Sequence, residues 1–550
     1  MKHWILPAML LLLGSLAGCT KDTTVHSTSD SQGVMTQRQV LTLATSTPLT
    51  TLDADKMTKF GRLNNTIEGL YQTNRDGQTQ LALAKRVQLN ATKTTYTFKL
   101  WQDSRWSNGD TITAQDFVYA WRRALAPQTK APEADLFLGI KNARQILAGD
   151  LPATQLGVHA KGRFTLVVTL DHPMVELPQR LAYPIFGPQN QRVATKWGAK
   201  YATQPKYQVY AGPFMVSSHG NTAKHWHLIP NPYYWDRKHV YLTRINVNVY
   251  HNQAQEWQDY QQGRLDEVRL QSKTDVKSAE TQTTYTARPY SKMILITYRH
   301  HSSTSIPSQL LRQTTTRLAI SHAVNRQALG RNTYGKSSLP AQGIVPAGLS
   351  RGLRGTTDFA ASQPDQTALT YQPKVARQQW RQALKKVHRH RITLTLSYLD
   401  TTHGRLVATQ LQKQLMTTLP GLTVRLKQRA QHLNGHSSPL NGDLNLNTQQ
   451  AQYADPLAML ALFTTTNSAN TTRWHNRDYD RLVAQASNAT AFNTQRWRTL
   501  LKADGILMRE QGVTPLFQPA STYLMNPHLN GVRFNTVGTL SNFKEAYFAR

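Results

Sequence analysis

The sequence is poor in several kinds of residue, and each shortage excludes a class of protein. Cys19 is the only cysteine among 550 residues, so neither an intrachain disulfide nor a thiolate metal site can form. Acidic residues number only 31 against 64 lysines and arginines, and no pair of catalytic carboxylates stands out. After the amino-terminal 19 residues, no stretch has the roughly 18 uninterrupted apolar residues that a transmembrane helix needs.

The excess of basic residues gives a formal net charge of +33, but it does not by itself indicate a nucleic-acid-binding protein. Lysine and arginine are scattered along the chain, with short groups such as "KKVHRHR" (385–391). No helix-turn-helix, RNP-like or zinc-finger pattern accompanies them. An anionic membrane or cell-wall surface suits such a charge equally well, so we expect no nucleic-acid partner.

The amino terminus predicts export. Residues 1–19 combine a basic start, a short apolar run and small residues before Cys19, as in a secretion signal. Leu16 to Cys19 is similar to a bacterial lipobox, whose cysteine is lipidated after cleavage, and residues 20–37 are typical of a flexible tether. We therefore expect a lipoprotein anchored by Cys19 to the extracellular face of the cell membrane, in a Gram-positive organism. The alternative is an ordinary signal peptide with a coincidental cysteine.

Strand and helix patterns alternate along the chain, which predicts an α/β fold. Strand 392–399, amphipathic helix 405–419 and strand 422–426 follow one another, and this order indicates a parallel βαβ unit. Thr113 and Asp116 form a pattern typical of a capped helix start. The other elements with clear periodicity are strands 96–101 and 245–250 and helices 113–125, 317–329 and 496–510.

Signals for catalysis and metal binding are weak. "GLSRG" (348–352) has the spacing of a nucleophile elbow around Ser350, but its flanks predict a loop instead of the strand and helix that this motif requires. "HWH" (225–227) and "HRH" (388–390) each bring two imidazoles onto one strand face, but their basic neighbours repel a cation. We expect no enzyme activity, no cofactor and no metal.

An ordered series of aromatic and Pro/Gly motifs runs through the whole chain. Taken singly, each is typical of core aromatics beside turns. The series comprises "TLD" (51–53), "EGLY" (68–71), "WSNGDTITAQDFVYAWRR" (106–123), "GPF" (212–214), "NPYYWD" (231–236), "RLAISHAVNR" (317–326), "YADP" (453–456) and "NFKEAY" (542–547). In this order the motifs resemble the oligopeptide-binding lipoproteins of bacterial ABC peptide importers, family 5 of the extracellular solute-binding proteins, over residues 40–550.

This resemblance implies a two-lobed α/β fold of the periplasmic-binding-protein (venus flytrap) type with an additional inserted domain. Lobe I would comprise residues 38–67, 200–290 and 520–550. The inserted domain would comprise residues 68–199, and lobe II residues 291–519. A monomeric binding protein of this kind would enclose an extended peptide between its lobes and pass it to the permease and ATPase subunits of the transporter, without chemistry of its own.

The resemblance also implies a set of ligand contacts. Family members carry a Gly-Trp-x-Ala-Asp-Tyr-x-Asp-Pro-like run whose first aspartate binds the α-ammonium of the peptide. In this chain Gln449 takes the tryptophan position and Gln452 that of the aspartate, while Asp455, beside Pro456, matches the later acid and suits a turn. The implied contacts are Thr58, Lys59, Phe60, Gln449, Gln450, Ala451, Gln452, Tyr453, Asp455, Asn470, Thr471, Trp474, Phe517 and Gln518.

The glutamine at position 452 leaves the identity of the ligand open. Its side-chain oxygen accepts a hydrogen bond but supplies no charge, and an enclosed ammonium without a counter-charge costs several kcal/mol. Three explanations remain: another acid substitutes, the ligand has no free amino terminus there, or general peptide capture has been lost. The alternative functions are therefore a receptor for a peptide pheromone or signal peptide, and a binder of a non-peptide solute.

Overall fold

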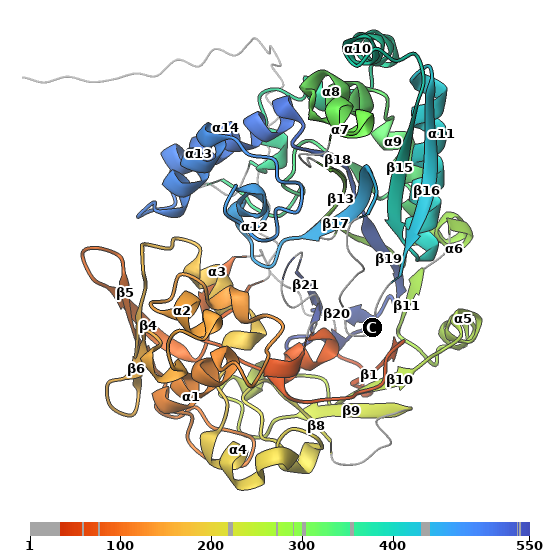
Figure 1. Cartoon of the computed structure of the whole chain (residues 1–550). Helices are drawn as coiled ribbons and strands as arrows, with labels where there is room; N and C mark the ends of the chain where they lie inside the picture. Colours follow the sequence, from red (N-terminus) through yellow and green to blue (C-terminus); the bar gives the residue numbers. More distant parts are fainter. Residues whose placement is uncertain are drawn as a thin grey trace, which may run out of the picture.

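The computed structural model describes residues 34–57, 60–74, 78–217, 224–270, 273–289, 291–299, 304–352, 357–430, 441–535, 537 and 541–550. Most of the helices and strands coloured green to blue lie in the upper part of the molecule in Figure 1, and those coloured red to yellow lie in the lower part, together with the blue carboxyl-terminal strands. The predicted α/β character is confirmed. Cys19, Thr58 and Lys59 lie outside the described residues.

The first two segments of the predicted lobe I, 38–67 and 200–290, meet in one sheet. Its strand order is β1-β10-β9-β8, and β1 (Val40–Thr45) runs parallel to β10 (Arg244–Val249). The other two strands, β9 (His225–Pro230) and β8 (Phe214–Val216), continue the sheet in antiparallel fashion. Alternate residues of β1 and β10 are fully buried, which explains why the alternation at 245–250 predicted a strand.

Residues 68–199 contain a four-stranded sheet of order β4-β5-β7-β6 and a two-stranded one of β2 and β3, and the four-stranded sheet lies at the lower left of Figure 1. The helix α1 (Ala114–Leu125) contacts this sheet and begins with the predicted capping box between Thr113 and Asp116. The predicted strand at 96–101 is β5 (Thr95–Leu100). The remaining strands and α-helices are β2 (Tyr71–Thr73), β3 (Thr79–Leu81), β4 (Ala84–Leu89), β6 (Val158–Ala160), β7 (Thr165–Thr169), α2 (Ala143–Ala148), α3 (Leu177–Leu181) and α4 (Gln191–Trp197).

Residues 291–519 contain a six-stranded sheet of order β14-β18-β13-β17-β15-β16. Its βαβ unit confirms the prediction, since β15 (Ile392–Leu399) lies parallel to β16 (Leu422–Arg429) and α11 (Thr402–Thr418) connects them. The other strands of the sheet are β13 (Lys292–Tyr298), β14 (Leu339–Pro340), β17 (Leu444–Gln450) and β18 (Val513–Gln518). Ser350 lies in a loop beyond β14, as predicted, and not at a strand-to-helix turn.

The predicted single helix at 317–329 is wrong, because the chain breaks there into two helices. The first ends at His322, and the second begins at Arg326. Asn325 caps the second helix by accepting a hydrogen bond from the backbone N–H of Ala328, and this cap makes a new start more favourable than continuation. The helices of this region are α7 (Ile306–Arg312), α8 (Thr314–His322), α9 (Arg326–Tyr334), α10 (Pro373–Lys386), α12 (Leu457–Leu460), α13 (Arg477–Ser487) and α14 (Thr494–Glu510).

The chain crosses between its two main parts at two neighbouring points. A three-stranded sheet of order β11-β19-β12 stands beside the six-stranded one. Its strand β12 (Tyr285–Pro289) leads directly into β13, and β18 leads through Pro519 into β19 (Ala520–Met525). These two crossings together are a candidate for a hinge between the two parts, which we call the hinge candidate. The elements around it are β11 (Glu267–Leu270), α5 (Gln253–Gln261), α6 (Lys273–Ala279), β20 (Leu529–Asn530), β21 (Arg533–Phe534), β22 (Ser541–Asn542) and β23 (Tyr547–Phe548).

Within the described residues, no helix is long and apolar enough to cross a membrane. In the same residues, each sheet of three or more strands draws all its strands from one predicted domain. The predicted domain boundaries themselves stay a prediction.

Candidate ligand-binding site

The run that follows β17 contacts the 68–199 segment through Gln452. The side-chain Nε2 of Gln452 donates a hydrogen bond to Oε2 of Glu133 over 3.1 Å. Glu133 is 8% exposed and immediately precedes the 3-10 turn Ala134–Phe137, whereas Gln452 is exposed. A carboxylate therefore lies directly against the position at which the resemblance expected one, but it comes from another part of the chain.

Glu133 and Tyr183 connect two of the predicted ligand contacts. The Tyr183 hydroxyl donates to Glu133, and burial, with the nearby carboxylate, raises the pKa of Tyr183. Phe60 meets the Tyr183 ring edge-on, with ring centroids 5.7 Å apart. Phe60 and Gln452 thus lie at the two ends of one contiguous group. Sequence patterns gave no sign of Glu133 or Tyr183, because their significance depends on a contact across more than 250 residues.

Tyr453 lies next to this group and meets the α3 helix. Nη2 of Arg180 donates to the Tyr453 hydroxyl over 3.2 Å, and the guanidinium lies 4.5 Å from the centre of the Tyr453 ring. The same Nη2 contacts Glu176 at 3.1 Å. Burial raises the pKa of Glu176 against the opposing effect of Arg180. Tyr453 therefore helps to join the 68–199 segment to the 291–519 segment.

Asp455 is occupied by a buried ion pair. Its Oδ2 and Oδ1 accept hydrogen bonds from Nη1 and Nη2 of Arg496, at 2.8 and 3.0 Å. Its Oδ1 also accepts from the backbone N–H of Leu457 at 2.9 Å, at the start of α12. Burial acts to lower the pKa of Arg496, but the contact with Asp455 outweighs it and leaves the pKa raised. In this arrangement Asp455 stabilises the fold. That Asp455 also contacts a ligand stays a prediction.

Asn470 and Trp474 organise a loop of the 291–519 segment. Nδ2 of Asn470 donates to three backbone carbonyls, including that of Trp474 at 2.8 Å. Trp474 is 5% exposed, and its Nε1 donates to Oε2 of Glu510 at 3.0 Å. Thr471 is exposed beside them. These contacts show how the loop is held, and its role towards a ligand stays a prediction.

The other predicted contacts lie near the hinge. Phe517 is fully buried and packs against Tyr334, with ring centroids 5.6 Å apart. Gln518 is 2% exposed and exchanges two hydrogen bonds with the backbone of Ala347. Ala451 is fully buried, and its backbone exchanges hydrogen bonds with Ser291. Gln449 is half-buried and Gln450 exposed, and the latter lies opposite Lys292 in the sheet.

A cavity of about 340 Å³ lies between the two strand crossings and the helices α9 and α11. Its lining includes the side chains of Arg269, Lys292 and His403, and no aspartate or glutamate stands among its described residues. Burial, followed by the charge of Arg269, lowers the pKa of His403. The lining residues are Arg269, Leu270, Val276, Lys292, Ile294, Thr333, Tyr334, His403, Thr448, Pro519, Ala520, Ser521 and Thr522. This basic pocket, as we call it, is suited to an anionic group.

One segment connects the basic pocket with Glu133. Thr448 of β17 lines the pocket, and Gln452, four residues later, contacts Glu133. β17 ends at Gln450, and Gln452 lies in the bend that follows it. A carboxylate and a cluster of basic groups therefore lie near the two ends of one five-residue stretch, 448–452.

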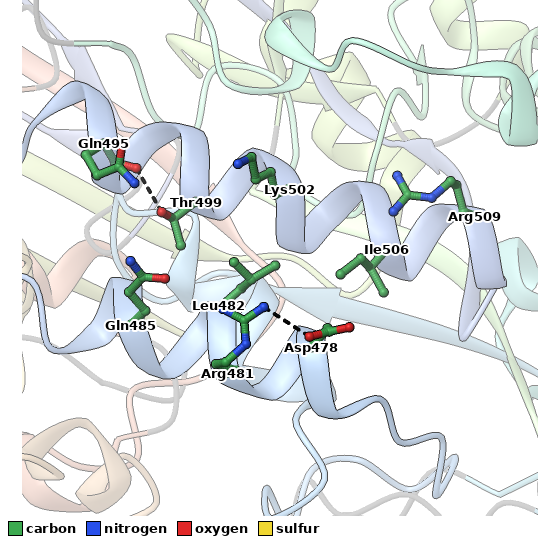
Figure 2. Close-up of a pocket in the computed structure, with 9 residues that line it drawn as sticks. All are labelled: Asp478, Arg481, Leu482, Gln485, Gln495, Thr499, Lys502, Ile506 and Arg509. Carbon is green, nitrogen blue, oxygen red and sulfur yellow. Dashed lines mark hydrogen bonds and ion pairs between the residues drawn. The ribbon is translucent and has the colours of Figure 1, made fainter.

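A second hollow, of about 410 Å³, lies between α13 and α14. Figure 2 shows its side chains. Arg481 forms an ion pair with Asp478, and the Thr499 hydroxyl donates a hydrogen bond to the backbone carbonyl of Gln495. Asp478 and Arg481 are 72% and 65% exposed, so salt screens their charges. The residues lining this hollow are Asp478, Arg481, Leu482, Gln485, Gln495, Thr499, Lys502, Ile506 and Arg509. It contains no element of the hinge or of the run after β17.

The histidine pairs do not form a metal centre in the described part of the chain. His225 and His227 lie on β9 with ring centroids 5.8 Å apart. No group of three or more potential ligands gathers around them or elsewhere among the described residues.

Comparison with known proteins assigns this architecture. The family model of the bacterial extracellular solute-binding proteins, family 5 (middle), matches residues 78–471. The chain belongs to family 5 of the bacterial extracellular solute-binding proteins. Family 5 proteins bind solutes and are not enzymes, in agreement with the sequence analysis.

A dipeptide-binding protein of Lactococcus lactis subsp. cremoris is 31% identical to this family 5 chain over 498 residues, which cover 88% of this chain and 89% of that protein. The solved structure of Listeria monocytogenes OppA bound to peptide superimposes with a TM-score of 0.74 at 29% identity, covering 94% of this chain and all of that one. The structure of the pheromone receptor PrgZ gives a TM-score of 0.74 at 26% identity, with 93% and 100% covered. The predicted two-lobed periplasmic-binding-protein fold is thereby confirmed.

Proposed function

We propose that this family 5 chain captures short peptides outside the cell and delivers them to the permease and ATPase subunits of an ABC importer. The observation that carries the proposal is that an acidic group and a basic pocket lie near two different positions of one segment. The Glu133 carboxylate contacts Gln452, and Thr448, four residues earlier, lines the basic pocket. A zwitterionic peptide, with an ammonium at one end and a carboxylate at the other, carries charges that match these two groups.

The strands around this segment suit peptide recognition. β17 and β13 expose Thr448, Gln450 and the half-buried Lys292 on one face beside the hinge. Neutral polar side chains of this kind accommodate varied ligand side chains through bridging water, while the charged ends orient the peptide. Relatives of this chain include a dipeptide-binding protein and a peptide-bound OppA, in keeping with such a ligand.

Capture would proceed by closure about the hinge candidate. In this proposal the predicted lobes are connected where β12 is followed by β13 and where β18 leads through Pro519 into β19. A ligand that contacts both lobes only when they are together stabilises that arrangement in proportion to its differential affinity. Such closure would present a defined surface to the transporter.

Anchoring through Cys19 completes the proposal. Membrane attachment by a lipid on this residue would hold the protein at the extracellular face, and its net charge of +33 would favour contact with anionic headgroups and wall polymers. Fractionation of cells that express Cys19→Ser is the test. The variant should appear in the medium, whereas retention of the variant in the membrane fraction would contradict lipid anchoring at this position.

Isothermal titration of the full chain in mild detergent, with a mixture of alanine-based tri-, tetra- and pentapeptides, tests the binding function. We expect saturable binding, and mass spectrometry of the retained peptides would show which length is preferred. A flat titration with every length would contradict the peptide proposal.

The likeness to the pheromone receptor PrgZ supports a second candidate, a receptor for a signalling peptide. In that case the protein would retain one sequence strongly and the alanine peptides not at all. Deletion of the gene would leave general peptide uptake unchanged. Both results together would favour the receptor over the importer component.

A further inference from the structure

Two aromatic rings lie against each other between two lysines at the end of α4, at the bottom of Figure 1. The ring centroids of Trp197 and Tyr207 are 4.5 Å apart. Nζ of Lys196 lies 5.2 Å from the centre of the Trp197 ring, and Nζ of Lys206 lies 5.0 Å from the centre of the Tyr207 ring. Both rings are partly exposed, and both lysines are exposed. Lys200, in the turn between them, is exposed as well, and we call these five residues the α4 patch.

The patch rests on backbone that is held by hydrogen bonds. α4 buries Val193 and Ala194, and the Asn190 side chain caps the helix by accepting a hydrogen bond from the backbone N–H of Val193 at 2.9 Å. The backbone N–H of Ala202 donates to the carbonyl of Tyr207 at 3.3 Å, which closes the loop after the helix. The fold itself therefore brings the two rings and their lysines together on one surface.

The patch is positively charged and has no acidic neighbour in the sequence. Residues 177–235 contain no aspartate or glutamate, although they include six lysines and arginines. Arg192, one turn before Lys196, is already paired with Asp110. Among the described residues, no carboxylate forms an ion pair with any of the three patch lysines. Their charges are therefore available to a partner outside the chain.

Lysines beside tryptophan and tyrosine suit the interface of an anionic lipid bilayer. Tryptophan and tyrosine are enriched at the level of the lipid headgroups, because each ring combines an apolar body with a polar edge. Each lysine near an anionic membrane surface strengthens binding about fivefold. A soluble polyanion would need only the charges, so the presence of the rings favours a bilayer over a polymer of phosphodiesters.

The helix α10 exposes lysines without such rings and provides the comparison. Lys385 and Lys386 in its last turn are exposed, whereas Trp380, its one aromatic side chain, is fully buried. α10 lies at the top of Figure 1 and α4 at the bottom, so the two faces lie at opposite ends of the molecule. One planar membrane surface cannot contact both faces at once. The rings select the α4 face.

We infer that the α4 patch is the surface through which this protein docks against the anionic headgroups of the membrane. This inference rests on the proposed location at the extracellular face. Fourteen residues separate Cys19 from Val34, the first described residue, and a chain of that length spans at most about 50 Å. A lipid anchor at Cys19 would therefore hold the patch at a high effective concentration beside the bilayer, where even weak contacts form.

The chain offers matched variants that separate local charge, net charge and the aromatic rings. All are made in the full-length chain with Cys19→Ser, the parent, so that no lipid anchor contributes. The patch variant loses two lysines of the α4 patch, the α10 variant loses two lysines elsewhere, and the ring variant keeps every charge. The three are Lys196→Gln with Lys206→Gln, Lys385→Gln with Lys386→Gln, and Trp197→Leu.

Co-sedimentation with vesicles tests the inference. Vesicles of phosphatidylglycerol with phosphatidylcholine are compared with vesicles of phosphatidylcholine alone, which give the background. The parent should bind the anionic vesicles above this background. The patch variant should bind them about 25-fold more weakly, because each of its two lysines contributes about fivefold. The α10 variant should keep most of the binding, and the ring variant should bind more weakly than the parent at the same net charge.

Equal losses in the patch and α10 variants would assign vesicle binding to net charge and overturn the inference. Binding of the parent no stronger than background would overturn it as well. Thermal unfolding shows whether each variant is folded, and if Trp197→Leu is not, the comparison of the two exposed lysine pairs decides.

A second partner is separated by its own measurement. Retention on immobilised poly(glycerol phosphate) that depends on the patch lysines, with vesicle binding unchanged in the ring variant, would assign the patch to a wall polymer and overturn docking on the bilayer. Vesicle binding is measured without peptide and without the anchor. A negative result would therefore leave the proposed peptide capture and the anchoring at Cys19 to their own tests.

Discussion

Arg496 holds Asp455 in a two-pronged ion pair, with N–O distances of 2.8 and 3.0 Å and with side chains that are 1% and 2% exposed. Arg496 lies on α14, and Asp455 lies in the run that leads from β17 to α12. Glu176 of the 68–199 segment lies 3.7 Å from the same guanidinium. One arginine therefore anchors the run that carries Gln452 and also faces the 68–199 segment.

Removal of the Asp455 charge should destabilise the protein strongly. In Asp455→Asn the Arg496 guanidinium stays buried beside a neutral amide, and loss of one partner of a buried pair costs about 3–5 kcal/mol. The apparent free energy of unfolding, measured by urea titration, should fall by about that amount. Asp478→Asn, which breaks the exposed pair with Arg481, is the control and should cost less than about 1 kcal/mol. Equal effects of the two changes would contradict the structural role of Asp455.

Stability should decrease with rising pH because of Asp504. Burial raises the pKa of Asp504 from 3.8 to about 7, even though the Ile344 backbone N–H donates to it. The folded chain therefore keeps a proton that the unfolded chain has lost, and stability falls between about pH 4 and about pH 7. A shift of about three pKa units corresponds to about 4 kcal/mol.

In Asp504→Asn the stability should change less with pH than in the wild type, whether the substitution raises or lowers the stability at any one pH. Thermal unfolding of the wild type and of the variant at pH 5, 6, 7 and 8 measures the difference in slope. Asp55, whose pKa burial also raises to about 7, stays in both proteins and cancels in the comparison. Parallel curves for the two proteins would show that Asp504 does not titrate in this range.

Gly343 should not tolerate a side chain, because it packs directly against Asp504. A Cβ at this position would lie 2.3 Å from Oδ2 of Asp504, which also accepts a hydrogen bond from Gln363 at 2.6 Å. Gly343→Ala should therefore lower the free energy of unfolding by about 1–3 kcal/mol, as overpacking does. The control is Gly352→Ala, where the nearest atom lies 3.7 Å away and a change within about 0.5 kcal/mol is expected. A similar cost for both would argue against the close contact.

The basic pocket should recognise the carboxyl terminus of the ligand. Arg269→Met should weaken the binding of peptides with a free carboxylate by about tenfold or more, because it removes a positive charge from a pocket in which no acidic residue stands among the described lining residues. Binding of the corresponding peptide amides should change little. Calorimetric titration at low and high ionic strength measures both effects. Lys502→Met, in the hollow between α13 and α14, is the control, and equal losses in the two variants would assign the effect to net charge alone.

Local patterns predicted the regular elements well. The alternation in 392–399, the helical spacing in 405–419 and the second alternation after Gly421 gave the parallel βαβ unit of β15, α11 and β16. Thr113 and Asp116 predicted the start of α1. These features depend on neighbours in sequence, because residues two or four positions apart decide which face of a strand or helix is buried. The same periodicity failed at 317–329, where the cap at Asn325 interrupts an otherwise helical pattern.

By itself the sequence determined the α/β class, the parallel unit and the family, since each depends on local order or on motifs kept in a fixed succession. Only the tertiary structure decided which side chains meet. Glu133 reaches Gln452 from 319 residues away, and Asp455 finds Arg496 on a helix 41 residues later. Side-chain periodicity encodes burial but not partners. A buried charge is stabilised only by the groups that pack against it, and those groups come from distant elements that meet when the chain folds.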